Sequence, residues 1–110
     1  MEELSSYLDE VILTIQNSSE YQICLSLKEK MKDNSKINTL VSQVKTTQKK
    51  YIRSHYDSII KKELDSLEEQ LLNIPIYHIY FDNLQRVNEM IHYVQDTLNQ
   101  YFYQLLNKKN

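Results

Sequence analysis

Apolar residues recur every three or four positions along almost the whole chain, which is the spacing of one face of an α-helix. The first such stripe consists of Leu4, Leu8, Val11, Ile12 and Ile15. The polar stretch QNSSE follows it, and there Asn17, Ser18 or Ser19 can cap a second helix. The inward stripe of that second helix reads Tyr21, Cys24, Leu27 (or Leu25) and Met31. The pattern thus predicts two short amphipathic helices, over about 4–16 and 19–32.

The middle of the chain carries an apolar stripe whose phase shifts once. After the stretch KDNSK, where Asn34 or Ser35 can cap a third helix, the stripe reads Ile37, Leu40 or Val41, Val44, Gln48, Tyr51 or Ile52, and His55. It resumes in a different phase as Ile60, Leu64, Leu67, Leu71 and Ile74. The shift falls in RSHYDS, so two alternatives stay open for the segment 35–73. Either the helix breaks near 54–57, with Ser54 or Asp57 as a cap, or one long helix absorbs a stutter.

The only proline of the chain, Pro75, separates that region from the most regular stripe. Proline suits the first turn of a helix and disfavours helical geometry at the residue before it, so one helix ends near 73 and another begins at 75. The stripe then reads Tyr80, Leu84, Val87, Ile91, Val94, Leu98, Tyr101 and Leu105. It predicts a helix over 75–107, which at 1.5 Å per residue is about 50 Å long.

These elements predict an all-α fold, because no segment shows the sustained alternation of a strand. The short link at 72–75 suits an antiparallel hairpin of the two long helices, with the short N-terminal helices packed on it in a bundle-like arrangement. A chain of 110 residues is too short for two independent cores, so we expect one helical domain over 1–110. No apolar run approaches the roughly 18 residues that span a bilayer, and the N-terminus MEELSSYLDEV is unlike a signal peptide. We therefore expect a cytoplasmic protein without membrane contact.

The stripe on 75–107 is longer than two short helices can cover, and Tyr93 and Tyr103 widen it. An exposed apolar patch of that size marks an interaction surface, so we expect self-association. The alternative is a monomer in which the N-terminal helices fold back over the stripe. The predicted interaction surface consists of Tyr80, Phe81, Leu84, Val87, Met90, Ile91, Val94, Leu98, Tyr101 and Phe102.

Composition argues against the common nucleotide enzymes, because the chain has no glycine and their phosphate-binding loops require it. The single cysteine, Cys24, lies in an apolar stripe and is interpreted as a small buried hydrophobe rather than a reactive thiol. His78 and His92 would lie about 21 Å apart along one helix, too far to share a metal. We therefore predict no metal, no cofactor and no catalytic site.

The net charge of −2 argues against general nucleic-acid binding, but the basic residues are unevenly distributed. Lys45, Lys49 and Arg53 fall on one face of the third predicted helix, and residues 45–62 hold six basic side chains against Asp57 alone. We interpret this face as solvated or as a charged docking face for a protein partner. The alternative is a phosphate-binding stripe, which would make the chain a helical nucleic-acid-binding protein.

Three stretches of the chain are specific enough to compare with known families: NSSEYQ, KEKMKDNSKINTLVSQVKTTQKK and LEEQLLNIPIYHIYFDNLQRVNEMIHYVQDTLN. Together they resemble the YlbF/YmcA family of small helical bacterial proteins, over nearly the whole chain. INTLVSQVKTTQKK and LEEQLLNIPI are closer to the YmcA branch. The resemblance implies an all-helical, often dimeric protein without enzymatic activity. It also implies a third protein, YaaT, as partner in a complex that influences RNase Y-dependent mRNA processing and, through it, competence, biofilm formation and sporulation.

The complex of that family has been associated with flavin and iron–sulfur cofactors, with cysteines in C-terminal tails. The present sequence ends in YQLLNKKN without such a cysteine, and Cys24 matches no tail cysteine, so we expect no cofactor. Residues and resemblance together predict a non-enzymatic regulatory adaptor that acts through protein contacts. The expected partners are a second copy or related helical proteins, with a YaaT-like protein as a further candidate.

Overall fold

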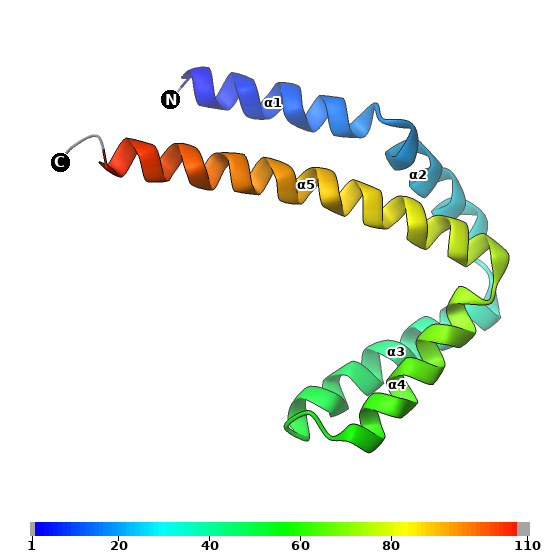
Figure 1. Ribbon diagram of the computed structural model, residues 1–110. Helices are drawn as coiled ribbons and strands as arrows, with labels where there is room; N and C mark the ends of the chain where they lie inside the picture. The colour runs from blue at the N-terminus through cyan, green and yellow to red at the C-terminus, as the bar shows by residue number, and fades with distance from the viewer. Residues whose placement is uncertain (1, 108–110) are drawn as a thin grey trace. The chain divides into compact units, whose positions relative to one another are not determined.

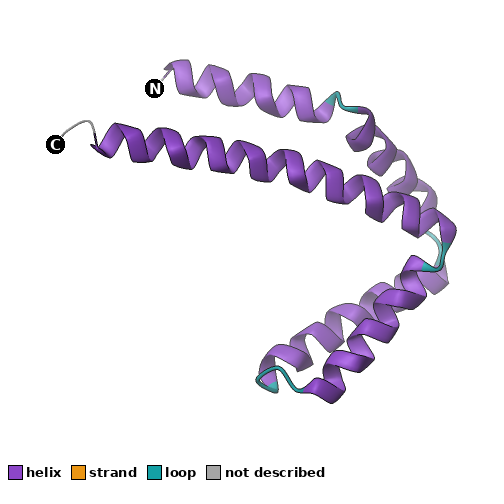
Figure 2. Ribbon diagram, viewed as in Figure 1, coloured by secondary structure: helices purple, strands orange, loops and turns teal. Residues whose placement is uncertain are grey.

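The computed structural model describes residues 2–107, which form five α-helices joined by short turns (Figures 1 and 2). The helices are α1 (Glu2–Gln16), α2 (Ser19–Met31), α3 (Ser35–Arg53), α4 (Ser58–Leu72) and α5 (Pro75–Asn107). No strand occurs among these residues, so the predicted all-α class is confirmed. No helix within 2–107 is long and apolar enough to cross a membrane.

Contacts between residues divide the chain into two compact units. The first, called the α1–α5 unit below, contains residues 2–24 and 83–107. The second, the α3–α4 unit, contains residues 25–82 and so includes the end of α2 and the first turns of α5. Each unit contains buried apolar side chains: Cys24 and Val87 in the first, and Met31, Ile37, Leu40, Leu64 and Leu71 in the second.

In the α3–α4 unit, α3 and α4 form an antiparallel hairpin that turns where the apolar stripe shifts phase (Figure 1). The Ser54 N–H donates to two of the last carbonyls of α3. Asp57 then caps α4, because its carboxylate accepts the N–H groups of Ile59 (2.8 Å) and Ile60 (3.2 Å). Of the two alternatives for 35–73, the structure shows the break. The segment expected to form one arm of a long hairpin is itself a hairpin.

The backbone of His55 and Tyr56, in the turn between α3 and α4, is left-handed, with φ of 58° and 68°. Glycine is the usual residue in this region, because a Cβ atom crowds the backbone there, but the chain has no glycine. The Tyr56 ring packs edge-on against Tyr51, with the ring centroids 5.3 Å apart, and this contact offsets part of the cost. The turn therefore contains strain that a single substitution can relieve.

We expect His55→Gly to raise the free energy of unfolding by roughly 0.5 kcal/mol, because the relieved strain exceeds the extra flexibility that glycine gives the unfolded chain. Chemical denaturation of parent and variant measures the difference. Ser66→Gly, at an exposed position in α4, is the matched control. Its backbone is helical, so this change should lower stability by about 0.5 kcal/mol. Similar losses in both variants would mean that the turn is not strained.

The buried stripe of α3 differs from the predicted one in its second half. Thr47 is buried, with 4% of its surface exposed, whereas Gln48 and Ile52 are exposed and His55 lies beyond the end of the helix. A stripe that starts at Ile37 and alternates steps of three and four residues reaches position 47. Position 48 lies about 100° further round the helix. The prediction that placed the glutamine in the stripe was wrong, because a threonine takes that place.

The core of the α3–α4 unit lies around the junction of α4 and α5. Its buried residues are Met31, Ile37, Leu40 and Leu71, each 7% exposed or less. Partly buried side chains surround them: Leu27, Val41, Val44, Leu67, Ile74, Ile76, Tyr77 and Tyr80. Half of this surrounding set comes from the residues on either side of Pro75. Pro75 therefore lies at the junction of α4 and α5, and the residues on both sides of it pack against the same core.

Tyr77 stands at the centre of the aromatic cluster that follows Pro75. Its ring stacks on Phe81, with centroids 6.4 Å apart, and tilts against Tyr80 at 6.0 Å. Burial raises the pKa of Tyr77 above its ordinary value, and Tyr80 and Glu68 add to the shift. The cluster thus anchors the first turns of α5 to the core of their own unit.

Candidate interaction surface

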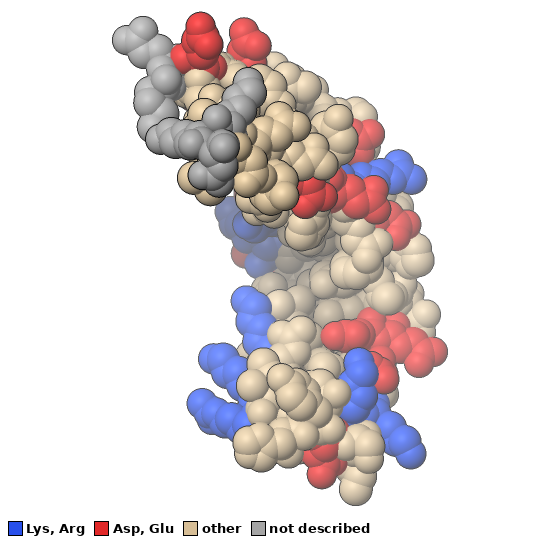
Figure 3. Space-filling view, turned by 60° about the vertical axis from the view of Figure 1, so that its left-hand side comes forward, with Lys and Arg blue, Asp and Glu red and all other residues tan. Residues whose placement is uncertain are grey.

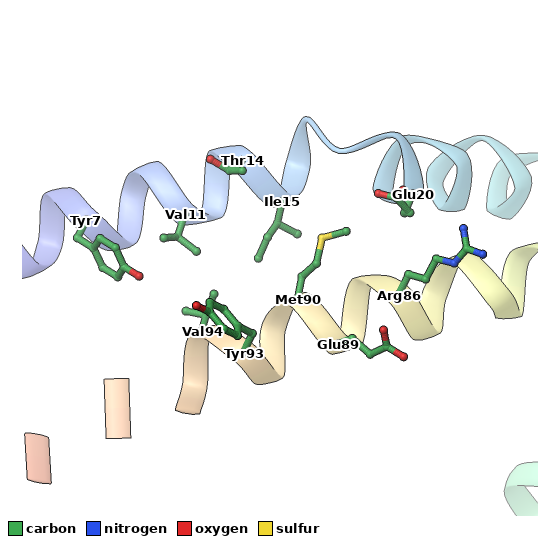
Figure 4. Close-up of a pocket in the computed structure, with 10 residues that line it drawn as sticks. All are labelled: Tyr7, Val11, Thr14, Ile15, Glu20, Arg86, Glu89, Met90, Tyr93 and Val94. Atoms are coloured by element: carbon green, nitrogen blue, oxygen red, sulfur yellow. The ribbon is translucent and has the colours of Figure 1, made fainter. Parts of the chain in front are cut away.

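In the α1–α5 unit, a groove of about 590 Å³ runs between α1, the start of α2 and α5 (Figure 4). It is lined by Tyr7, Val11, Thr14, Ile15, Glu20, Arg86, Glu89, Met90, Tyr93 and Val94. Val11 and Ile15 of α1 lie opposite Met90 and Val94 of α5, so the floor of the groove is apolar. The four floor side chains are half-buried.

The spacing of residues on the two helices builds this groove. Tyr7, Val11 and Thr14 follow one another at steps of four and three on α1, and Met90 and Val94 lie one turn apart on α5. Each helix therefore turns a row of side chains toward the other. A layer of two helices buries the seam between them but leaves the outer side of that seam open.

A second hollow of about 340 Å³ continues along the same two helices. It is lined by Glu3, Leu4, Tyr7, Thr97, Leu98 and Tyr101. Tyr7 lines both hollows. The apolar surface between α1 and α5 therefore extends from Met90 to Tyr101, about three turns of α5.

The last turns of α5 carry a run of exposed apolar side chains, called the aromatic end of α5 below. Its members are Tyr101 (48% exposed), Phe102 (44%), Tyr103 (70%), Leu105 (46%) and Leu106 (68%). The rings of Tyr101 and Phe102 meet edge-on, with centroids 5.6 Å apart. No charged residue occurs from 97 to 107. The aromatic end is thus both apolar and uncharged.

The residues of the predicted interaction surface have three different environments in the structure. Tyr80 packs against the core of the α3–α4 unit, and Phe81 stacks on Tyr77 beside it. Val87 is 5% exposed, so its inclusion in a surface is corrected: it is buried in the α1–α5 unit. The others are half-buried or exposed on α5: Leu84, Met90, Ile91, Val94, Leu98, Tyr101 and Phe102. The predicted interaction surface therefore included both side chains that pack inside the protein and side chains that remain accessible to a partner.

Charge is distributed unequally between the two units. Residues 1–24 and 83–110 hold seven acidic and three basic residues, for a formal net charge of −4, and over residues 2–107 Arg86 is the one basic residue of the α1–α5 unit. The seven acidic residues are Glu2, Glu3, Asp9, Glu10, Glu20, Glu89 and Asp96. Residues 25–82 have ten basic and eight acidic residues, for a net charge of +2. The groove is thus an apolar floor within an acidic surface.

The predicted charged docking face lies on α3. Lys45, Lys49 and Arg53 are all exposed. Figure 3 shows Lys and Arg side chains over α3 and α4, with Asp and Glu side chains beside them. A cleft of about 230 Å³ between these helices is lined by Ser42, Gln43, Thr46, Thr47, Lys50, Glu63 and Leu67. Because it places the Glu63 carboxylate beside a single ammonium group, this cleft does not favour a phosphate.

Cys24 is buried, with 8% exposed, as the sequence predicts. Burial raises the pKa of its thiol, which lowers the fraction of reactive thiolate. Glu89 and His92 have the three-residue spacing of ligands in some helical metal sites. However, no three His, Cys, Asp or Glu side chains in the described part of the chain could hold a metal together. An iron–sulfur cluster takes several cysteine thiolates, so the residues present do not fit one.

We expect the purified chain to be colourless and to contain no stoichiometric iron or zinc after dialysis, since one buried thiol cannot supply a coordination sphere. Elemental analysis and the visible absorption spectrum measure this. Cys24→Ser is the comparison variant, because it keeps the size of the side chain. Metal that survives dialysis in the parent and is lost from the variant would show that Cys24 is a ligand.

Comparison with known proteins supplies independent information about this chain. The family model for YlbF/YmcA, described as control of the competence regulator ComK, matches residues 6–101, a range that includes α2, α3 and α4 completely. YmcA of Bacillus subtilis (strain 168) is 26% identical over 90 residues, which cover 76% of this chain and 63% of that protein. The chain thus spans less than two thirds of the length of that relative. No solved structure matches the chain.

Proposed function

This chain belongs to the YlbF/YmcA family, and from this premise we propose that it is a non-enzymatic regulatory adaptor that acts by binding other proteins. The family is described by its control of a competence regulator, which supports a regulatory role. In the proposal, the chain influences RNase Y-dependent mRNA processing and, through it, competence, biofilm formation and sporulation. Its partners are related helical proteins and a YaaT-like protein.

One observation carries the proposal of protein contacts: the α1–α5 unit leaves a long apolar surface accessible. The groove and the adjoining hollow occupy about three turns of α5, and the aromatic end adds five exposed apolar side chains beyond Leu98. Soluble proteins rarely expose contiguous apolar surface of this extent unless a partner covers it. A two-helix layer of this kind gains stability when further helices pack on its open side.

Self-association is part of this proposal, and the aromatic end of α5 is the surface that suits it. A symmetric dimer brings the same surface patch of two copies together. Residues 97–107 have no charge, so two copies can meet there without repulsion between like charges. Aromatic side chains such as Tyr101 and Phe102 also bury large apolar areas at interfaces.

A second candidate function is nucleic-acid binding, which is favoured by the exposure of Lys45, Lys49 and Arg53 on α3. These positions are four residues apart, so they can follow a phosphate backbone along one face. The net charge of the α3–α4 unit is only +2, however, because eight acidic residues lie among the ten basic ones. We therefore regard this surface as a solvated face rather than as a nucleic-acid site, and the adaptor does not need it for the partner that its α1–α5 unit binds.

We expect the combined change Lys45→Glu, Lys49→Glu and Arg53→Glu to leave both helicity and RNA binding unchanged. Exposed substitutions usually shift stability by no more than about 0.5 kcal/mol each, and the adaptor has little RNA affinity to lose. Circular dichroism and titration of labelled RNA at two salt concentrations measure both properties. The control reverses three exposed charges elsewhere: Lys28→Glu, Lys30→Glu and Lys32→Glu.

The outcome that would favour nucleic-acid binding is specific. The parent would bind RNA tightly, and the logarithm of its affinity would fall with that of the salt concentration at a slope near −0.7 per neutralised phosphate. That binding would disappear in the α3 variant and persist in the control.

A further inference from the structure

We propose that the groove between α1 and α5 binds an amphipathic helix of another protein, with Lys or Arg flanking its apolar face. This inference rests on the proposed function, because it names the class of partner that such an adaptor takes. Three observations carry it: the shape of the groove, the carboxylates along it, and a separate uncharged surface that suits a second copy.

The shape of the groove fits a helix. Val11 and Ile15 on one side and Met90 and Val94 on the other form two facing rows of apolar side chains, into which the ridge of a third helix can pack. The apolar surface continues to Tyr101, about 16 Å along α5, which matches three turns of a partner helix. A small-molecule site encloses most of its ligand, whereas the seam of this two-helix layer is open along its outer side.

The carboxylates along the groove indicate a basic partner. Glu20 and Glu89 line the groove together with one basic residue, Arg86, and Asp96 follows Glu89 by seven residues, two turns along the same face of α5. Tyr93 lies between these two positions and is 74% exposed. A partner helix with Lys or Arg at a seven-residue spacing can pair with both carboxylates. Its cationic side chains can also lie over the Tyr93 ring.

A second copy fits the groove poorly. Two copies that met groove to groove would bring two units of formal net charge −4 together, with Arg86 as the one basic residue that lines each groove. The basic face of α3 on a second copy is no better, because the apolar side of α3 is already packed in its own core, through Ile37 and Leu40. The groove therefore favours a different chain as its occupant, and the part of the aromatic end beyond Tyr101, from Phe102 to Leu106, remains for self-association.

Two synthetic helices of about 18 residues, roughly 27 Å long, test the proposal. Both have Leu at heptad positions a and d, and they differ only at the flanking positions, which are Lys in one peptide and Glu in the other. Fluorescence anisotropy gives the dissociation constant of each peptide for the full chain. Measurements at about 0.1 M and about 1 M salt vary the screening of charges, because the Debye length falls from about 10 Å to about 3 Å. Amide chemical shifts of the ¹⁵N-labelled chain give the binding site.

We expect the Lys peptide to bind and to shift the amides of Val11, Ile15, Met90 and Val94, and to lose affinity at high salt. Glu20→Lys combined with Glu89→Lys should weaken its binding at least about tenfold, since two attractive contacts become repulsive. Glu69→Lys together with Glu63→Lys, on α4, is the matched control and should leave the affinity unchanged. Equal binding of the Glu peptide, shifts confined to other residues, or equal weakening by the control would each overturn the proposal. So would groove amides that shift with rising protein concentration and no peptide, because a second copy would then occupy the groove.

The experiment separates this inference from the proposed function. If the chain binds the Lys peptide in the groove but captures no protein from cells, the inference about the groove stands and the proposed function is wrong. If the chain captures proteins from cells but does not bind the Lys peptide, the proposed function stands and the inference about the groove is wrong.

Discussion

Leu71→Ala is expected to lower the free energy of unfolding by about 3 kcal/mol, because it leaves a cavity in the core of the α3–α4 unit. Leu71 is 3% exposed and belongs to the buried cluster with Met31, Ile37 and Leu40. Loss of a buried leucine side chain removes its transfer free energy and also the contacts of the atoms that lined it, for a total of about 2–5 kcal/mol. Urea denaturation followed by circular dichroism measures the change.

The control for this prediction is Ile59→Ala on the same helix. Ile59 is 76% exposed, so its truncation should change stability by no more than about 0.5 kcal/mol. If Leu71→Ala and Ile59→Ala lowered the free energy of unfolding equally, the result would contradict the burial of Leu71 in this core.

Phe102→Asp is expected to convert a self-associated protein into a monomer. The parent should show at least twice the chain mass of 13.2 kDa in light scattering at micromolar concentration. A carboxylate placed in the apolar contact would lose its hydration without gaining a partner, at a cost of several kcal/mol. A cost of about 2.8 kcal/mol alone raises the dissociation constant a hundredfold.

Gln100→Asp is the matched control, because it adds the same charge to the same helix at an exposed polar position. It should leave the oligomer intact. A parent that is monomeric at micromolar concentration would rule out self-association. Equal dissociation by both variants would show that added charge alone, rather than contact with Phe102, separates the copies.

The helix boundaries were largely predictable, because short-range chemistry determines them. Asn34 accepts the Ile37 N–H at 2.9 Å, Asp57 caps α4, and Pro75 begins α5. Asn34 and Asp57 accept backbone N–H groups that would otherwise be unpaired, and Pro75 has no N–H to leave unpaired. These effects act within one turn, so the sequence alone indicates where the helices begin. On α2 the inward alternative Leu27 is half-buried, whereas Leu25 is 47% exposed.

The sequence did not reveal which way α3 turns its polar residues, or the left-handed turn that follows. Thr47 and Gln48 are both polar, so hydrophobicity could not choose between them. His55 and Tyr56 adopt a conformation usually left to glycine, and in a chain without glycine the sequence gives no local signal for it. These features depend on how α3 and α4 pack together.

The groove could not be predicted from the sequence, because its two sides come from distant parts of the chain. Tyr7 and Val94 line the same groove although 87 positions separate them along the chain. The predicted surface was taken from α5 alone and omitted Tyr7, Thr14 and Glu20. A signal for Tyr7 was present, since it precedes Val11 by four residues on the helix. That the N-terminal helices fold back over the stripe on 75–107 was one of the alternatives from the sequence, but spacing alone could not show which side chains of the two helices meet.

Quantitative capture of proteins from cell lysate treated with ribonuclease tests the adaptor proposal most directly. The baits are the parent, the variant with Val94→Asp and Phe102→Asp, and the variant with Lys45→Glu, Lys49→Glu and Arg53→Glu, each shown to be folded by circular dichroism. The parent should retain at least one other protein in an amount comparable to its own, identified by mass spectrometry. The α5 variant should lose that protein, and the α3 variant should keep it. Capture that disappears with ribonuclease, or that is lost from the α3 variant and kept by the α5 variant, would contradict an adaptor that acts through its α1–α5 unit.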